Sequence, residues 1–248
     1  MFAHERQEKI VTLVAKSHRM EVQELMRILG VSAATLRRDL AYLEQKDRVV
    51  RVHGGVCHPS AMSSEPNFGQ KAAMSVKSKT MIAQAVFRAI PQGATVFIDG
   101  GTTCLEAGRL LRSRADLTII TNSLPLISTH EQFAARLLVL GGERRSVSSA
   151  LVGDLSLSSL GRLRADFALI GASGLHAHDG AGTTELLESE VKREWIARSK
   201  QAFLLADSSK WAVTAPVYFA RWEEFDKFFT DNKPPAPFHK QNLKIILP

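Results

Sequence analysis

The chain has 248 residues, of which 45% are hydrophobic and 23% charged, a composition that supports a packed core and excludes global disorder. Lys and Arg outnumber Asp and Glu by 32 to 25, and the net charge of +7 favours a polyanionic partner without identifying one. No apolar run approaches the roughly 18 residues of a membrane helix, and the first residues are polar and charged, so we expect a cytoplasmic protein without a membrane partner. The two cysteines lack the paired spacing of a zinc site, and we expect no metal and no cofactor.

Residues 1–57 predict a small domain that contains two helices joined by a tight turn. Apolar residues recur at helical spacing from Val22 to Leu29, Gly30 stops that helix, and Ser32 can cap the next one. In the second helix, Ser32 to Leu43, a stripe of leucines faces inward and two adjacent arginines are left outside. A β-branched run, Val49 to Val52, followed by a glycine turn predicts a hairpin wing. The pattern indicates a winged helix-turn-helix.

The outward face of the second helix suits nucleic acid. A helix in the major groove needs an uncrowded first turn and cationic side chains that reach phosphates or guanine edges. The candidate DNA-contacting residues are Ser32, Ala33, Ala34, Thr35, Arg37, Arg38, Arg48, Arg51 and His53. On spacing alone, an ordinary surface helical hairpin, whose arginines are only solvated, is an equal alternative to a DNA-binding helix.

Residues 58–76 contain Pro, Ser and Gly with little apolar periodicity and are interpreted as a linker. From residue 77 to 248, apolar bursts alternate with longer amphipathic segments, which is typical of an α/β domain with a mainly parallel sheet. The seven predicted strands are 94–98, 117–121, 137–140, 167–170, 202–206, 225–230 and 243–247, and the clearest predicted helices are 80–90 and 187–199.

Small polar residues follow five of these bursts. Because ligands of open parallel sheets bind outside the carboxyl ends of the strands, the five clusters can converge on one pocket. Glycines admit close backbone approach, hydroxyls at a helix start suit phosphate, and an ammonium group neutralises it. The candidate effector-binding residues are Asp99, Gly100, Gly101, Thr102, Thr103, Asn122, Ser123, Gly141, Gly142 and Lys210. The alternative is that turns need such residues for geometry and capping alone, and Lys210 can pair with Asp207 instead.

The order of several segments closely resembles the DeoR family of bacterial transcriptional regulators. The matching residues are Glu5 to Ile10, Gly30-Val31-Ser32, Thr35 to Leu40, Val52 to Gly55, Glu65 to Phe68 and Lys79. The resemblance implies that Ser32 to Leu43 is a recognition helix, that Arg37 and Arg38 touch operator DNA, and that the second domain is a sensor related in fold to ribose-5-phosphate isomerase. Family effectors are typically phosphorylated sugars. Lys71 and Ser75 depart from the family, where arginine and asparagine are usual.

Two acidic positions need interpretation. Asp39 lies beside the predicted DNA face, where phosphate would repel it, so we interpret it as a partner that orients Arg38 or a neighbouring basic residue. Glu188 and Lys192 are four residues apart on a predicted helix, and a surface ion pair is the favoured interpretation. The alternative makes Glu188 the general base of a sugar-phosphate isomerase.

The sequence therefore predicts a DNA-binding regulator and not an enzyme. We expect a repressor of a carbohydrate-catabolism operon that a phosphorylated sugar or related metabolite releases from operator DNA. We also expect a homodimer or homotetramer, because one small winged domain makes few contacts with DNA. The alternatives are a sugar-phosphate isomerase-like enzyme with an accessory DNA-binding domain and a non-specific architectural DNA binder.

Overall fold

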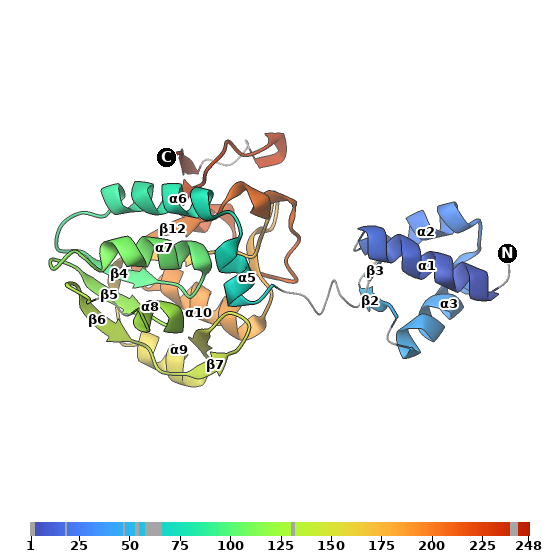
Figure 1. Cartoon of the computed structure of the whole chain (residues 1–248), viewed down its shortest axis with the longest axis horizontal. Helices are drawn as coiled ribbons and strands as arrows, with labels where there is room; N and C mark the ends of the chain where they lie inside the picture. The colour runs from blue at the N-terminus through green and yellow to red at the C-terminus, as the bar shows by residue number, and fades with distance from the viewer. Residues whose placement is uncertain are drawn as a thin grey trace. The chain divides into compact units, whose positions relative to one another are not determined.

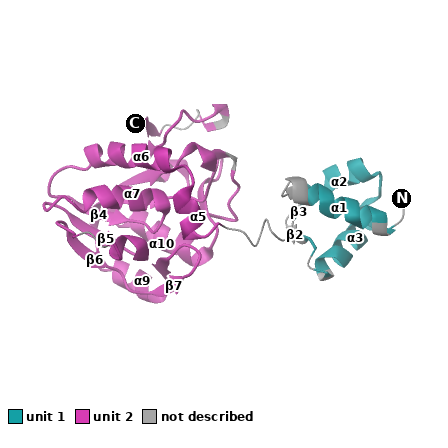
Figure 2. Ribbon diagram, viewed as in Figure 1, with its two compact units in different colours: residues 1–65 teal, residues 66–248 magenta. Residues whose placement is uncertain are grey.

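The computed structural model describes residues 3–17, 19–46, 48–52, 55–57, 66–129, 132–238 and 243–248. The chain divides into two compact units, residues 1–65 and 66–248 (Figure 2). Within the described ranges, no helix is both long and apolar enough to cross a membrane.

The first unit is a three-helix domain with a small sheet. Its helices are α1 (Ala3–Ser17), α2 (Val22–Leu29) and α3 (Ala33–Gln45), and its strands β1 (Arg19–Glu21), β2 (Val50–Val52) and β3 (Gly55–Cys57) pair antiparallel in the order β1-β3-β2. Gly30 ends α2 in the left-handed conformation at φ 64°, and the hydroxyl of Ser32 accepts from the Thr35 amide at the start of α3. Ile10, Leu25 and Leu36 are fully buried in its core. The predicted helix-turn-helix is confirmed, while the wing turn at residues 53–54 lies outside the described residues.

The second unit is built on one parallel sheet of seven strands. These are β4 (Thr95–Ile98), β5 (Thr118–Thr121), β6 (Arg136–Val139), β9 (Ala165–Gly171), β12 (Ser199–Leu205), β14 (Lys227–Phe229) and β15 (Lys244–Ile246). Their order is β15-β14-β12-β9-β4-β5-β6. Every neighbouring pair is parallel, and each strand coincides with one of the seven predicted apolar bursts.

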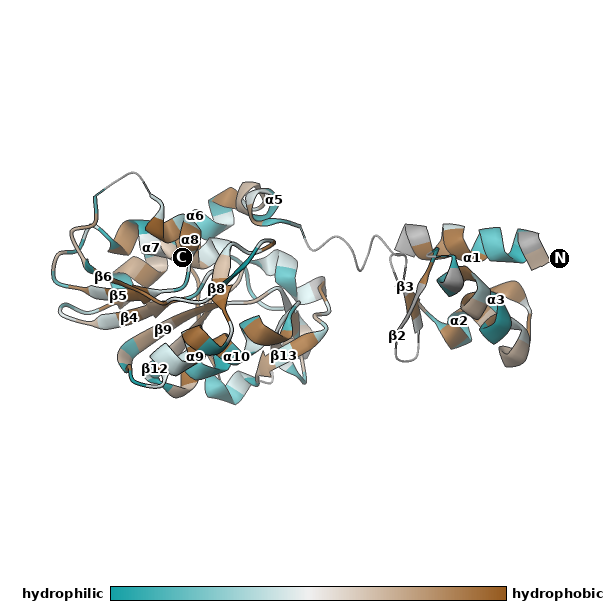
Figure 3. Cartoon of the chain, turned by 90° about the horizontal axis from the view of Figure 1, so that it is seen from below, coloured by the Kyte–Doolittle hydropathy of each residue, from teal (hydrophilic) through white to brown (hydrophobic). Residues whose placement is uncertain are grey.

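Helices cover both faces of this sheet (Figure 1). One face packs against α6 (Val76–Ala89), α7 (Thr102–Leu111) and α8 (Leu124–Ile127), and the other against α9 (Asp154–Leu160) and α10 (Leu186–Ala197). Successive residues of β4 alternate between the two cores: Val96 and Ile98 belong to the first and Phe97 to the second. Figure 3 shows the resulting concentration of apolar residues along the central strands. Because both faces are covered, the strands are apolar on both sides and stand out in the sequence.

Several shorter elements were not predicted. A hairpin pairs β7 (Glu143–Arg145) with β8 (Ala150–Val152), and a second sheet contains β10 (Gly174–His176), β11 (Gly180–Thr183) and β13 (Val217–Ala220). Single-turn helices are η1 (Ser208–Ala212), η2 (Trp222–Glu224) and η3 (Ala236–Phe238). The predicted linker, 58–76, holds a further helix, α5 (Phe68–Ala73), where Asn67 and Gln70 form a reciprocal capping box. None of the residues of α5 is fully buried, so the helix has no apolar periodicity by which the sequence could predict it.

Ser75 provides a test of local strain. It precedes α6 at φ 50° in the left-handed region, and its hydroxyl makes no capping bond to the helix. Asn tolerates this conformation better than other residues that carry a Cβ atom. We expect Ser75→Asn to raise the free energy of unfolding by about 0.5 kcal/mol in denaturant titration. Ser75→Ala, which keeps the Cβ atom without that tolerance, serves as the comparison, and an equal gain from both variants would contradict this account.

Candidate functional site

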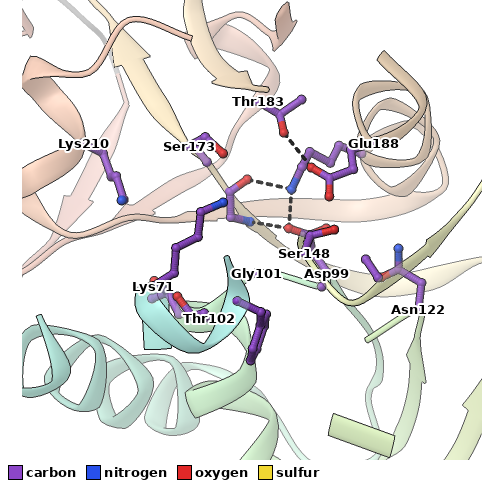
Figure 4. A pocket seen from close by; sticks show the side chains of 17 residues that line it. Lys71, Asp99, Gly101, Thr102, Asn122, Ser148, Ser173, Thr183, Glu188 and Lys210 are labelled. Carbon is purple, nitrogen blue, oxygen red and sulfur yellow. Dashed lines mark hydrogen bonds and ion pairs between the residues drawn. The ribbon is translucent and has the colours of Figure 1, made fainter. Parts of the chain in front are cut away.

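A pocket opens at the carboxyl ends of β4, β5 and β9 (Figure 4). Seven of the ten predicted effector residues line it: Asp99, Gly100, Gly101, Thr102, Thr103, Asn122 and Lys210. The other polar side chains that line the pocket were not among the candidate effector residues, although Ser173 follows a predicted strand and Glu188 was the general base of the isomerase alternative; they are Lys71, Ser148, Ser173, Thr183, Glu188 and Lys192. Most of these come from α5, the β7–β8 turn, β11 and α10, which do not follow a predicted strand.

The floor of the pocket is an ion pair between Asp99, at the end of β4, and Lys192, on α10. Both side chains are almost fully buried, with 5% and 7% of their surfaces exposed. Asp99 Oδ2 also accepts from the Gly171 amide at 3.0 Å, and Lys192 Nζ donates to the Gly171 carbonyl at 3.0 Å. Burial alone lowers the pKa of Lys192, but the charges of Asp99 and Glu188 outweigh burial and raise that pKa above its ordinary value.

The predicted surface ion pair between Glu188 and Lys192 is wrong. Both residues are buried, 8% and 6% exposed, and Glu188 binds Arg145 of β7 and the hydroxyl of Thr183. The distances are 3.3 Å from Arg145 Nη1 to Glu188 Oε1 and 2.9 Å from Thr183 Oγ1 to Glu188 Oε2. The spacing of four residues is the same for an exposed and a buried pair, so the sequence pattern does not distinguish them. The arrangement ties the β7–β8 hairpin to α10.

The N-terminus of α7 forms one wall of the pocket. This ten-residue helix begins at Thr102, and its cap position, Gly101, carries no side chain that could satisfy the first amides. Gly100 lies so close to the β7–β8 hairpin that a Cβ atom there would be 2.6 Å from the Ala150 Cβ atom. Glycine at position 100 therefore allows the hairpin to pack over the start of α7, whereas the close approach of a ligand, for which this glycine was selected, stays a prediction.

Lys71, on α5, and Lys210, on η1, bring positive charge to the same pocket. Burial lowers the pKa of Lys210, the Asp207 charge raises it, and the Lys71 charge lowers it further. Asp207 caps η1 by accepting from the Ser209 amide and hydroxyl. Two ammonium groups that influence each other electrostatically are a site of positive potential, which an anion stabilises.

Buried Lys79 fixes the position of α5. Its ammonium group donates to the carbonyls of Lys71 and Met74 at the end of that helix. Burial lowers the pKa of Lys79. The structure thus assigns a positional role to a residue that was recognised only through family resemblance.

Three predicted effector residues do not line the pocket. Ser123 is fully buried and its hydroxyl accepts from the Leu126 amide at the start of α8. Gly141 accepts from the Ser156 hydroxyl at 2.6 Å. A Cβ atom on Gly142 would lie 2.2 Å from that same hydroxyl oxygen, so this glycine serves close packing. For these positions the turn and capping interpretation describes the contacts observed.

The α3 helix presents the predicted DNA face. Ser32, Ala33, Ala34, Arg37 and Arg38 are exposed and Thr35 is half-buried. Asp39 orients a basic residue, but not Arg38. Its Oδ2 accepts from Arg6 Nε of α1 at 2.5 Å and its Oδ1 from Gln7 Nε2 at 3.1 Å. Asp39 is only 4% exposed, and through these bonds its buried carboxylate joins α3 to α1.

The predicted wing contacts are less fully described. Arg48 is half-buried and forms a two-point ion pair with Glu8 of α1, in which Nη2 lies 3.0 Å from Oε2. Arg51 belongs to β2, but its side chain lies outside the described residues, as does the whole of His53.

A helix-turn-helix unit followed by an α/β domain with a polar pocket defines a DNA-binding transcriptional regulator with a sensor domain. Residues 6–61 match the DeoR-like helix-turn-helix domain, and residues 74–232 match the DeoR C terminal sensor domain. The chain belongs to the DeoR family of transcriptional regulators.

Curated relatives cover nearly the whole chain. The glycerol-3-phosphate regulon repressor of Escherichia coli K12 is 32% identical over 235 residues, which span 94% of this chain and 92% of the relative. The HTH-type transcriptional regulator GlpR of Haloferax volcanii is 32% identical over 231 residues, 93% of this chain and 91% of the relative. A distant solved structure, ribose 5-phosphate isomerase A of Methanocaldococcus jannaschii, covers 54% of this chain and 53% of its own at 15% identity and a TM-score of 0.38.

The buried Lys192–Asp99 pair can be tested by unfolding. We expect Lys192→Met to lower the free energy of unfolding by about 3–5 kcal/mol, because it leaves a buried carboxylate without its cation. Adding Asp99→Asn to Lys192→Met should recover part of that loss in a double-mutant cycle.

Lys200→Met is the matched control, since Lys200 forms an exposed ion pair with Asp166. That substitution should change stability little. Equal losses from the two lysine variants would contradict the assignment of Lys192 as an anchor.

Proposed function

We propose that this regulator represses a carbohydrate-related operon and that a phosphorylated sugar or related metabolite, bound in the pocket, releases it from operator DNA. The observation that carries the proposal is the meeting of Lys71, Lys210 and the N-terminus of α7 at one pocket. A phosphate group accepts hydrogen bonds from helix-terminal amides and gains from both ammonium charges. The relatives named for the glycerol-3-phosphate regulon support an effector of this chemistry.

Operator contact is proposed for the exposed face of α3. Small side chains at Ala33 and Ala34 leave its first turn uncrowded, and Arg37 and Arg38 project from the next. The Asp39–Arg6 ion pair would hold that helix against α1 while it is in the groove. Binding as a dimer or tetramer would then raise affinity through two or more half-sites.

Coupling between the two activities is proposed to run through α5. This helix contributes Phe68 and Lys71 to the pocket, and the chain that precedes it continues directly to the DNA-binding unit. An effector that prefers one arrangement of α5 must weaken DNA binding by the same factor by which DNA weakens effector binding.

An isomerase activity is the alternative, and the presence of Glu188 in the pocket is the observation that favours it. A general base needs a lone pair directed at the substrate. Both carboxylate oxygens of Glu188 are instead engaged, by Arg145 and Thr183. This geometry supports a structural role for Glu188 and a binding role for the pocket, and aldose–ketose turnover by the purified protein would contradict that assignment.

The operator contacts can be tested with paired arginine variants. We expect Arg37→Ala with Arg38→Ala to abolish sequence-preferring DNA binding in a fluorescence anisotropy titration, because both exposed guanidinium groups are removed from the recognition face. Arg162→Ala with Arg164→Ala is the matched control, since these two exposed arginines of the sensor domain carry the same charge. Equal loss in both variants would indicate a non-specific charge effect.

The phosphate site can be tested by calorimetry with a panel of sugar phosphates. We expect Lys210→Met and Thr102→Ala each to weaken binding at least tenfold, the range of one charge-assisted hydrogen bond. Because the pKa of Lys210 is lowered, its charge is lost at lower pH than for an ordinary lysine, so affinity should fall as the pH rises through that pKa. Lys210→Met should lack this part of the pH dependence, and unchanged affinity in the variant would place the phosphate elsewhere.

A further inference from the structure

Two buried oxygen atoms in the pocket have no hydrogen-bond partner among the described residues. They are Asn122 Oδ1, which follows β5, and Ser148 Oγ, in the turn between β7 and β8. Asn122 as a whole is only 2% exposed. A buried polar atom without a partner loses its hydrogen bonds to water and gains none in return, so its position in a pocket points to a group that binds there.

The orientation of the Asn122 amide is set by its neighbours. The side-chain Nδ2 of Asn122 donates to the backbone carbonyl of Leu151 at 2.9 Å, and the backbone amide of Leu151 donates to the backbone carbonyl of Asn122 at 2.9 Å. Turning the side-chain amide over would place its oxygen against a carbonyl. The atom that remains available is therefore Oδ1, which only accepts hydrogen bonds.

The Ser148 hydroxyl is held in place by the hairpin around it. Arg145 ties β7 to Glu188 of α10, and the Ser149 amide donates to the Arg145 carbonyl at 2.8 Å. The Ser149 carbonyl in turn accepts from the Leu124 amide at 3.1 Å, which joins the turn to α8. The turn is thus anchored on two sides, and its hydroxyl can donate or accept without breaking any bond.

Asn122 and Lys210 lie at opposite sides of the pocket. Figure 4 shows Lys210 on one side of the site and Asn122 on the other, with Gly101 and Thr102 between them. A single ligand that reaches both ends needs an anionic group at the first and a hydrogen-bond donor at the second. A second phosphate or carboxylate would bring its own acceptors against Asn122 Oδ1.

We propose that Asn122 and Ser148 form a hydroxyl subsite that selects a sugar or polyol carrying one phosphate and a free hydroxyl remote from it, and that rejects bisphosphates. This specificity rests on the proposed phosphosugar function. Sites built to bind a hydroxyl reject analogues that lack it, because the buried acceptors are then left unpaired.

The test compares matched ligands by calorimetry on the full chain. The probes are glucose 6-phosphate and 2-deoxyglucose 6-phosphate, ribose 5-phosphate and 2-deoxyribose 5-phosphate, fructose 1-phosphate, glycerol 3-phosphate, fructose 1,6-bisphosphate and inorganic phosphate. For the monophosphate that binds most tightly, the mono-deoxy analogues at its other hydroxyl positions are added. We expect one deoxy analogue to bind at least about tenfold more weakly than its parent and the bisphosphate to bind more weakly than the monophosphate.

Ser148→Ala is the decisive variant. We expect it to weaken binding of the preferred monophosphate at least about tenfold and to leave the affinity for inorganic phosphate unchanged, because the phosphate end keeps its lysines. The melting temperature without ligand should not fall, since the hydroxyl has no protein partner to lose. Ser146→Ala, an exposed serine in the same turn and outside the pocket lining, is the control.

The outcomes separate the two proposals. If the monophosphate binds and Ser148→Ala or every deoxy analogue binds equally well, the hydroxyl subsite is wrong and the phosphosugar function stands. Bisphosphate binding equal to that of the monophosphate also overturns the subsite. If no probe binds, both proposals are overturned together.

Discussion

The structure of the sensor domain depends on the buried ion pair between Asp99 and Lys192. It lies where β4 and β9 end and where α10 crosses them, and through the Gly171 amide and carbonyl it joins all three elements. Two charges removed from water are stable only if they compensate each other and their remaining hydrogen-bonding groups are satisfied. That requirement fixes the helix on the sheet and leaves a rigid polar floor at the carboxyl edge, which is where a parallel sheet binds ligands.

The same compensation explains why the rim, and not the floor, is assigned to phosphate. Asp99 is paired with Lys192, and Glu188 with Arg145, so the buried charges of the floor cancel. Burial is the main cause of the lowered pKa of Lys210, the Asp207 charge opposes it, and the like charge of Lys71 adds a smaller lowering. An incoming dianion removes the repulsion between these two lysines and satisfies the first amides of α7. A neutral sugar would gain neither term, so the proposed preference for a phosphorylated ligand rests on this charge arrangement.

The sequence predicted the sheet well and the site partly. Strands covered on both faces are continuous apolar runs, so all seven bursts correspond to strands of one parallel sheet. The residues from Asp99 to Thr103 after β4 and Asn122 after β5 meet in the pocket, whereas Ser123 does not. The predictions failed where the local sequence pattern does not report how deeply a side chain is buried or which distant residue it contacts. Glu188 and Lys192 have the spacing of a surface pair but are buried, and Asp39 pairs with Arg6, 33 residues away in sequence. Ser148 had no signal, because it lies in a turn that follows no predicted strand.

The small helix α5 is the element through which we propose that the pocket is coupled to the DNA-binding unit. None of the α5 side chains is fully buried: Phe68 packs in part against the core formed with α6 and α7, and the Lys79 ammonium binds the last carbonyls of the helix. Desolvation of the Lys79 ammonium lowers its pKa and opposes its burial. Lys79 lies on α6 and binds the backbone carbonyl of Lys71, a residue that lines the pocket. An element held by a few polar bonds has a small free-energy gap between alternative positions, and a ligand that contacts it changes their populations by its difference in affinity for the two. The limited burial of α5 therefore suits the proposed role of this helix in transmitting effector occupancy along the chain.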